Sequence, residues 1–283
     1  MHDLVGVITG ASSGMGRAAA LALAARGIKL VLLGRNQHRL EQVRNEIMQV
    51  HPGAEADIFV MDLSSLREVR EVAARIVARY PRIDILLNNA GAILGKRQTT
   101  AEGFEQSLAT NHLGPFLLTR LLLERLVQSP AGRIIQVSSV AHKYAAPDLG
   151  DFQMTRNYNP WIAYSNVKLY NIMFVHELDR RLKAQGLPVV VNAVHPGAVR
   201  TGFGAEAGWL SRAMLWLMQP FFISAAQGAD TSVYLATDPA AGHISGQYLV
   251  NRQVASLQHP LLTLEFEGAL WQLSEELTGG TFL

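Results

Sequence analysis

The chain has 283 residues, 49% of them hydrophobic, and its 25 basic and 23 acidic residues give a net charge of +2 at pH 7. This length and hydrophobic content allow one large domain with a sizeable core. The near-neutral charge, without a basic stripe, argues against a nucleic-acid partner. The absence of cysteine excludes disulfides, thiolate metal sites and a cysteine nucleophile.

Short apolar runs alternate with helical patterns along the chain. The expected strands are residues 4–8, 28–33, 56–61, 83–87, 133–137, 188–194 and 247–250. The expected helices are residues 17–26, 37–50, 65–80, 100–109, 114–128, 161–185 and 224–237. This alternation predicts an α/β protein with a single-domain Rossmann fold, in which helices flank a doubly wound parallel sheet of about seven strands. Ligands of such sheets bind at the carboxyl ends of the strands.

The first expected strand ends in a glycine-rich turn, Thr9-Gly10-Ala11-Ser12-Ser13-Gly14-Met15-Gly16, and a helical pattern follows. Glycines let the backbone approach an anion closely, and the start of a helix offers free N–H groups. The segment therefore predicts a phosphate cradle. The alternative is a tight strand-to-helix turn that binds nothing.

Tyr164 and Lys168 are four residues apart, which places them on one face of a helix, one turn from each other. A nearby ammonium group favours the phenolate form of tyrosine and lowers its pKa toward neutrality. The pair is therefore a candidate acid/base device. Because this spacing also arises by chance, the alternative is a tyrosine and a lysine on a helix surface.

Further short motifs fall at or just beyond expected strand ends: Asp62-Leu63, Asn88-Asn89-Ala90-Gly91, Asn111, Ser138-Ser139, His195-Pro196-Gly197 and Thr201. Together with the glycine-rich turn and Tyr164 and Lys168, they resemble the short-chain dehydrogenase/reductase family from residue 4 to about residue 250. The runs Val137-Ser138-Ser139-Val140-Ala141-His142 and Val194-His195-Pro196-Gly197, and the long gap before Tyr164, are most similar to its retinol-dehydrogenase-like and WW-domain-oxidoreductase-like branch. The resemblance implies one domain over residues 1–283, with a cofactor-binding half at about 1–130 and a catalytic and substrate half at about 131–283.

The resemblance also implies the catalytic roles. Tyr164 would be the general acid in carbonyl reduction and the base in alcohol oxidation, and Lys168 would lower its pKa and bond the nicotinamide ribose. Ser139 would hydrogen-bond the substrate oxygen as charge develops on it. Asn111 would hold a water that links Lys168 to solvent, although a helix-end asparagine of no catalytic importance is an equal alternative from the residues alone.

The implied cofactor is NADP(H), because Gly34 and Arg35 stand where NAD-selective relatives carry an acidic residue. A guanidinium there can bind a 2′-phosphate, with Arg39 assisting and Arg17 as a further candidate; the alternative is a solvated arginine. Asp62 would accept from the adenine amino group, or is simply a turn carboxylate. The full set of expected cofactor contacts is Gly10, Ser12, Ser13, Gly14, Met15, Gly16, Arg35, Arg39, Asp62, Leu63, Asn89, Ala90, Gly91, Tyr164, Lys168, Pro196, Gly197 and Thr201.

Neither His142 nor His195 has a carboxylate at metal-motif spacing, and no HExxH or GxSxG motif is present, so we expect no metal site and assign both histidines loop or structural roles. Two segments bear on the substrate. Residues 143–160 could line the pocket or cap the sheet. Residues 202–222, rich in aromatic residues and methionine, stand where the family has its substrate lid, although a core helix or a partner or membrane surface is the alternative.

The resulting hypothesis is an NADP(H)-dependent oxidoreductase that interconverts a hydrophobic alcohol and its aldehyde or ketone. A non-catalytic NADP(H)-binding sensor or scaffold on the same fold is the alternative, and intact Ser139, Tyr164 and Lys168 argue against it. An extended-family epimerase or dehydratase would need a larger C-terminal domain. The apolar helices at 114–128 and 161–185 predict a homodimer or homotetramer. Because the chain opens on its first strand, without a leader, anchor or spanning stretch, we expect a cytoplasmic protein.

Overall fold

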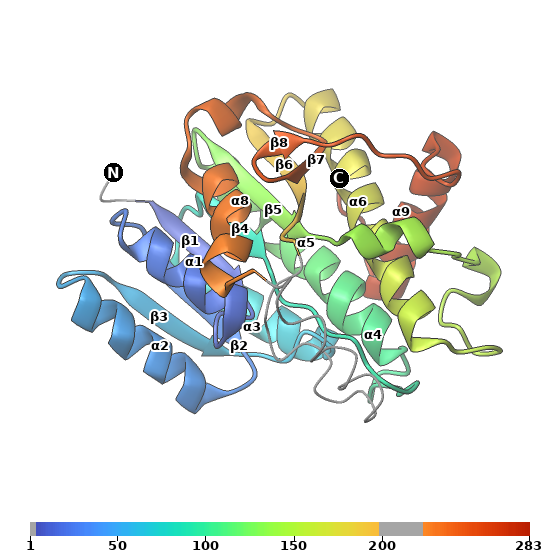
Figure 1. Ribbon diagram of the computed structural model, residues 1–283, viewed down its shortest axis with the longest axis horizontal. Coiled ribbons are helices and arrows are strands. Elements are labelled where there is room, and N and C mark those ends of the chain that lie inside the picture. The colour runs from blue at the N-terminus through green and yellow to red at the C-terminus, as the bar shows by residue number, and fades with distance from the viewer. Residues whose placement is uncertain (1–3, 198–222) are drawn as a thin grey trace.

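A computed structural model of the chain describes residues 4–197 and 223–283, and its strands form one eight-stranded sheet in the order β3-β2-β1-β4-β5-β6-β7-β8 (Figure 1). The strands are β1 (Val5–Thr9), β2 (Lys29–Gly34), β3 (Ala56–Val60), β4 (Ile85–Asn88), β5 (Gly132–Val137), β6 (Val189–His195), β7 (Gln247–Val250) and β8 (Gln253–Val254). Neighbouring strands are parallel except β7 and β8, which form an antiparallel pair. The predicted α/β fold with a doubly wound parallel sheet is confirmed, and β8 is an addition at its edge.

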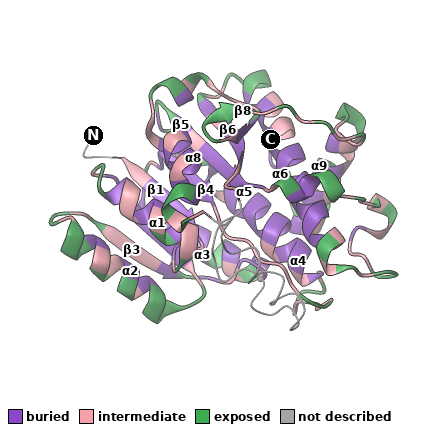
Figure 2. Cartoon of the chain, viewed as in Figure 1, coloured by how far each residue is buried: buried purple, intermediate pink, exposed green. Residues whose placement is uncertain are grey.

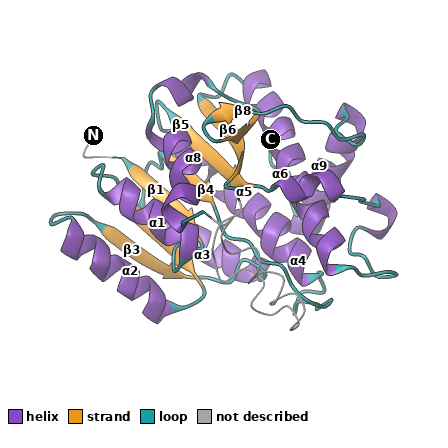
Figure 3. Ribbon diagram, in the orientation of Figure 1, coloured by secondary structure: helices purple, strands orange, loops and turns teal. Residues whose placement is uncertain are grey.

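Helices cover both faces of the sheet (Figure 3). The α-helices are α1 (Gly14–Ala24), α2 (Gln37–Val50), α3 (Leu66–Arg79), α4 (Gln106–Leu108), α5 (Gly114–Val127), α6 (Pro160–Ala184), α8 (Ala225–Thr237) and α9 (Leu264–Thr278). A π-helical turn, η1 (Ala109–Leu113), joins α4 to α5, and short 3₁₀ turns are η2 (Val140–Tyr144), η3 (Leu149–Asp151) and η5 (Ala240–His243). Helices α1, α2 and α8 contribute to one core, and α3, α5, α6 and α9 contribute to the other.

The central strands are apolar along their length because both of their faces are covered. Strand β1 pairs with β2 on one side and β4 on the other, so that Val7 lies between Val31 and Leu86. All three side chains are buried, as are most residues at the centre of the sheet (Figure 2). Uninterrupted apolar strands of this kind are typical of a parallel sheet with helices on both sides.

The expected helix at 100–109 is wrong over its first half. Thr99 instead forms a β-bridge with Glu105, and Gly103 takes a φ of +86° in the turn between them. Helix α4 begins only at Gln106, where the Glu105 carboxylate accepts from two free backbone N–H groups, those of Ser107 and Leu108. The helix therefore starts where a side chain can cap it.

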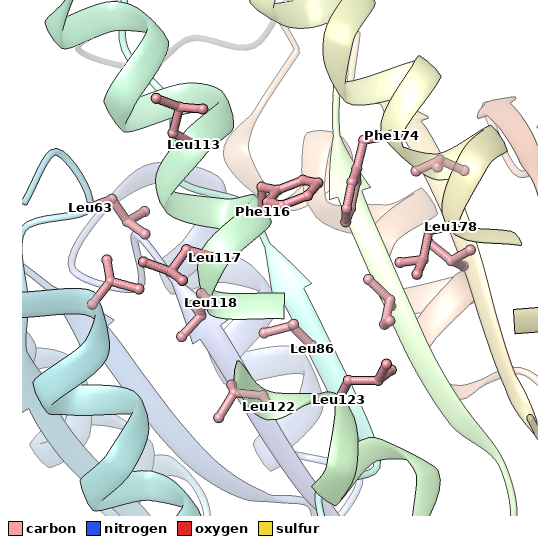
Figure 4. Close-up of a cluster of buried hydrophobic side chains, with 14 of the residues drawn as sticks. Leu63, Leu86, Leu113, Phe116, Leu117, Leu118, Leu122, Leu123, Phe174 and Leu178 are labelled. Atoms are coloured by element: carbon pink, nitrogen blue, oxygen red, sulfur yellow. The ribbon is translucent and has the colours of Figure 1, made fainter. Parts of the chain in front are cut away.

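Helix α9, which the sequence analysis did not predict, packs against α6 and contacts α5. Its Trp271 lies 5.1 Å from Phe116 of α5 and 5.9 Å from Phe174 of α6, measured between ring centroids. Phe116 and Phe174 themselves face each other between the two helices (Figure 4). The apolar side chains that suggested a homodimer are buried within one chain, except Leu121, which is half-buried. That argument for a dimer is therefore wrong, while the assembly itself stays a prediction.

Candidate active site

The sequence motifs meet at the carboxyl edge of the sheet, around β1 and β4. The glycine-rich turn follows β1, and residues 89–91 follow β4, which is the neighbour of β1. Ser139 follows β5, the next strand along, and Pro196 follows β6. The chain winds outward in opposite directions from β1 and β4, and a crevice at such a switch point is where open α/β sheets bind their ligands.

Ser139 and Tyr164 share a hydrogen bond, although they come from different elements. Ser139 is the N-cap of η2, where its Oγ accepts from the backbone N–H of Ala141 at 3.2 Å. Tyr164 lies in the first turns of α6, a helix that Asn159 caps with its side chain and Pro160 begins. Two local capping arrangements therefore hold the serine and the tyrosine at fixed positions.

Lys168 lies one turn beyond Tyr164 on the same helix, with its Nζ 5.3 Å from the centroid of the tyrosine ring. The side chain is buried, and Nζ donates to the carbonyl oxygen of Val137 at 3.1 Å. Burial, which disfavours the charged form, lowers the pKa of Lys168 to about 8. The predicted Tyr164–Lys168 pair therefore exists, with the ammonium group beneath the ring.

The pKa of Tyr164 moves in the direction opposite to the one expected. Burial raises it, and the hydrogen bond from Ser139 lowers it only in part. Only 6% of Tyr164 is exposed, and burial disfavours the charged phenolate.

Asn111 lies in the π-helical turn η1 and uses its side chain to fasten the loop after β4. Its Oδ1 accepts from the N–H of Ala92 at 3.0 Å, and its Nδ2 donates to the carbonyl oxygens of Ala92 and Ser107. A Cβ on Gly91 would come within 2.9 Å of Asn111 Oδ1 and 3.2 Å of Lys168 Nζ. Asn111, Gly91 and Lys168 are therefore neighbours, and a larger residue at position 91 would require the Asn111 and Lys168 side chains to shift.

The glycine-rich turn has the backbone geometry of an anion cradle. Gly10 takes a φ of +67°, and a Cβ on Gly16 would lie 2.2 Å from the Gly10 carbonyl oxygen. Asn89 supports the turn by donating from Nδ2 to the Thr9 carbonyl oxygen at 2.9 Å. At the start of α1 the side chain of Ser13 makes no capping hydrogen bond, so it does not occupy the first free N–H groups of the helix. These features fit the diphosphate of a dinucleotide.

The arginines expected near the adenosine ribose differ in whether their guanidinium groups are already paired. Arg35, just beyond β2, and Arg39, in the first turn of α2, are exposed, and neither guanidinium bonds another residue in the described part of the chain. Arg17 instead forms an ion pair with Glu46 of α2, with Nε 2.7 Å from Oε2. Arg35 and Arg39 are therefore free to bind a phosphate, whereas the side candidate Arg17 is already paired.

The remaining predicted cofactor contacts also lie around the carboxyl edge of the sheet. Asp62 is half-buried, and its Oδ1 accepts from the N–H and the hydroxyl of Ser64, both at 2.9 Å. Leu63 is buried. Gly197 takes a φ of +87° directly after β6, and a Cβ there would lie 2.8 Å from Ile223. Thr201 and the expected lid at 202–222 lie outside the described residues.

His142 and His195 hold the loop that carries Ser139. The sequence predicted only loop or structural roles for them. The Nδ1 of His142 lies 2.7 Å from the Ser139 carbonyl oxygen, and the Nδ1 of His195 accepts from the N–H of Val140 at 3.3 Å. Burial lowers the pKa of both imidazoles, that of His195 to about 4. Among the described residues no group of histidine and acidic side chains could hold a metal ion.

The chain matches the family described as short chain dehydrogenase over residues 5–208. It is 41% identical to a Streptomyces sp. (strain C5) protein provisionally named daunorubicin C-13 ketoreductase, over 97% of this chain and 92% of that protein. It is 38% identical to mouse retinol dehydrogenase 14, over 99% of this chain and 87% of the relative.

Solved structures lead to the same family. A crystal structure of an uncharacterised protein from Mycobacterium paratuberculosis superposes with a TM-score of 0.81 at 32% identity and covers 99% of this chain and 95% of its own. A provisionally assigned short chain dehydrogenase from Escherichia coli CFT073, complexed with NADPH, has a TM-score of 0.68 at 26% identity, with coverage of 88% and 96%. The resemblance expected from the motifs, including its retinol-dehydrogenase-like branch, is confirmed.

Proposed function

Since this chain belongs to the short-chain dehydrogenase family and is an oxidoreductase, we propose that it uses NADP(H) to interconvert a lipophilic alcohol and its aldehyde or ketone. The observation that carries the proposal is the hydrogen-bonded pair of Ser139 and Tyr164, with the buried Lys168 behind the tyrosine ring. A phenol, a hydroxyl and an ammonium group arranged in this way can bind a carbonyl oxygen and give it a proton.

Ser139 and Tyr164 have different roles at the substrate oxygen. When bound, the nicotinamide would supply or accept the hydride. Ser139 donates a hydrogen bond to the oxygen as negative charge develops, and Tyr164 transfers its proton to that oxygen. Burial raises the pKa of Tyr164, so the phenol carries the proton that carbonyl reduction consumes.

Lys168 and Asn111 would replace the proton that Tyr164 gives up. Pro115 has no N–H, so the backbone carbonyl of Asn111, four residues earlier, lacks its α-helical donor. The π-helical geometry of η1 is the local response, and a carbonyl of this kind can bind a water. We assign the water to this backbone carbonyl, because the side chain of Asn111 is bonded to Ala92 and Ser107.

Arg35 and Arg39 support NADP(H) over NAD(H). They are exposed beside the end of β2, where no carboxylate stands, and neither is paired within the described chain. The two can grip a 2′-phosphate through charge-assisted hydrogen bonds, and the solved relative that holds NADPH makes such a cofactor plausible for this fold. Gly10–Gly16 and Asn89–Gly91 would hold the diphosphate and adenosine, with Asp62 and Leu63 at the adenine and Pro196, Gly197 and Thr201 at the nicotinamide.

The lipophilic substrate is proposed from the relatives, whose names specify daunorubicin, retinol and polyprenol. No described helix is long and apolar enough to cross a bilayer. A homodimer or homotetramer and a cytoplasmic location stay predictions. Light scattering of the wild type measures the mass of the assembly, and a monomeric mass would contradict the predicted oligomer.

The deciding experiment is a turnover screen of the purified chain against lipophilic aldehydes and ketones, with NADPH and with NADH. We expect NADPH oxidation that Tyr164→Phe abolishes. Retained turnover in that variant would contradict the catalytic assignment. If no carbonyl is reduced while NADPH binds tightly, the alternative of a non-catalytic NADP(H)-binding protein replaces the enzyme.

A further inference from the structure

We propose that Tyr144 and Trp161 form an aromatic surface that binds the planar, conjugated part of the substrate beside Tyr164. This inference rests on the proposed function, because it names the class of substrate that the same site prefers. It extends the expectation that residues 143–160 line the pocket, by separating the aromatic residues that face solvent from those that belong to the core.

The aromatic side chains of this region fall into two groups. Phe152 is buried, with its ring 5.1 Å from that of Tyr170, and the hydroxyl of Tyr158 donates to Glu105 at 3.2 Å. In contrast, 61% of Tyr144 and 46% of Trp161 are exposed. Core packing accounts for the first group, whereas the second group presents two adjacent rings to solvent.

The exposed ring of Trp161 lies next to the phenol of Tyr164, and the exposed ring of Tyr144 lies next to that of Trp161. The Trp161 and Tyr164 ring centroids lie 6.1 Å apart with an interplanar angle of 36°, and Tyr144 lies 6.0 Å from Trp161. Trp161 and Tyr164 are three residues apart on α6 and therefore share a face. A flat ligand stacked on Trp161 would therefore lie beside the phenol of Tyr164.

Both rings lie near the ends of capped elements, Trp161 at the start of the long helix α6 and Tyr144 at the end of the short turn η2. The N–H of Trp161 donates to Asn159 Oδ1 at 2.9 Å at the start of α6. Tyr144 ends η2, the turn that Ser139 begins, and Val140 in the same turn is 43% exposed. The apolar surface is therefore fixed relative to Ser139 and Tyr164, which is what positioning a substrate oxygen requires. A surface for a protein partner would not need this link to the catalytic hydroxyls.

The aromatic rings of Tyr144 and Trp161 favour ligands that contain π systems. Indole and phenol faces bind other π systems by offset stacking, an attraction added to the burial of apolar area. A saturated ligand of the same carbon skeleton gains only the burial. The surface should therefore favour fused aromatic or polyene carbonyl compounds over saturated ones of equal size.

The test compares 2-naphthaldehyde with its decahydro counterpart, which has the same skeleton but no π system. We expect Trp161→Leu to lower kcat/KM for naphthaldehyde about tenfold more than for the saturated aldehyde. Trp161→Phe should recover most of that loss, and Tyr144→Leu should give a smaller loss of the same kind. Met48→Ala removes an exposed apolar side chain on α2 and should change neither value. Equal losses for both aldehydes in Trp161→Leu would overturn the proposal.

A binding measurement separates this proposal from the proposed function. Calorimetry with 2-naphthalenemethanol, without cofactor, requires no turnover. We expect its Kd to rise about tenfold in Trp161→Leu and to stay unchanged within about twofold in Met48→Ala, which lies outside the site. If the wild type reduces no carbonyl but this difference in Kd holds, the proposed reaction fails and the aromatic surface stands. If both aldehydes are reduced but the Kd values are equal, the aromatic surface fails and the reaction stands.

Discussion

Replacing Trp271 by alanine should destabilise the protein strongly, because this side chain joins α9 to the two helices beneath it. Only 2% of Trp271 is exposed. Its ring stacks on Phe282 at 4.9 Å, meets Phe116 edge-on at 5.1 Å, and lies under the Arg181 guanidinium at 4.6 Å. Truncation of a tryptophan in such surroundings typically costs about 3–5 kcal/mol of unfolding free energy.

The lower end of that range applies here. The buried Nε1 of Trp271 has no hydrogen-bond partner among the described residues, and an unpaired buried donor is itself unfavourable by about 1–3 kcal/mol. Because alanine removes this donor together with the ring, we expect Trp271→Ala to lose about 3 kcal/mol. At roughly 2 °C per kcal/mol for a chain of this length, Tm should fall by about 6 °C.

Urea unfolding followed by circular dichroism measures this loss, with Trp271→Phe as the matched control. Phenylalanine keeps an aromatic ring in the cluster and lacks the N–H, so its loss should stay within about 1 kcal/mol. A loss below about 1 kcal/mol in Trp271→Ala, or equal losses in the two variants, would refute the packing of α9 on α5 and α6. In that case the apolar face of those helices would be available for a partner subunit.

Three further predictions address the site and the pH dependence of stability. Tyr164→Phe should lower kcat at least about 100-fold, as loss of a general acid does, while the Kd for NADPH changes less than about threefold; an unchanged kcat would exclude Tyr164 as the acid. Arg35→Ala should weaken NADPH binding by about 1.5–3 kcal/mol and leave NADH binding unchanged, whereas Arg26→Ala, at the far end of α1, should affect neither. Burial lowers the pKa of His112 to about 4 from its ordinary 6.5, so between these values the unfolded chain binds more protons. The free energy of unfolding should therefore be at its full value above pH 6.5 and fall by up to about 3 kcal/mol per such histidine toward pH 4. His112→Gln should reduce that fall in acid titrations of stability, and an identical fall in wild type and variant would contradict the assignment.

The amino-acid sequence by itself determined the fold and the candidate site residues. Strands such as β2 and helices such as α2 can be predicted locally, because the spacing of apolar residues and the flanking turn residues are visible within a few positions of the chain. The order of strands and helices then restricts the sheet to a doubly wound topology, which places every strand-end motif at one edge. The grouping of Ser139, Tyr164 and Lys168 in one site came instead from the resemblance of the motifs to the short-chain dehydrogenase/reductase family.

Only the tertiary structure decided which of several possible partners each side chain meets. Arg17 pairs with Glu46, and Trp161 stays exposed whereas Phe152 is buried, because these outcomes depend on neighbours far away in the chain. The raised pKa of Tyr164 has the same origin: spacing along a helix predicts a nearby ammonium group, but desolvation depends on everything packed around the phenol. Whether the apolar faces of α5 and α6 are free likewise depends on α9, which begins about eighty residues after the end of α6 and packs against both helices.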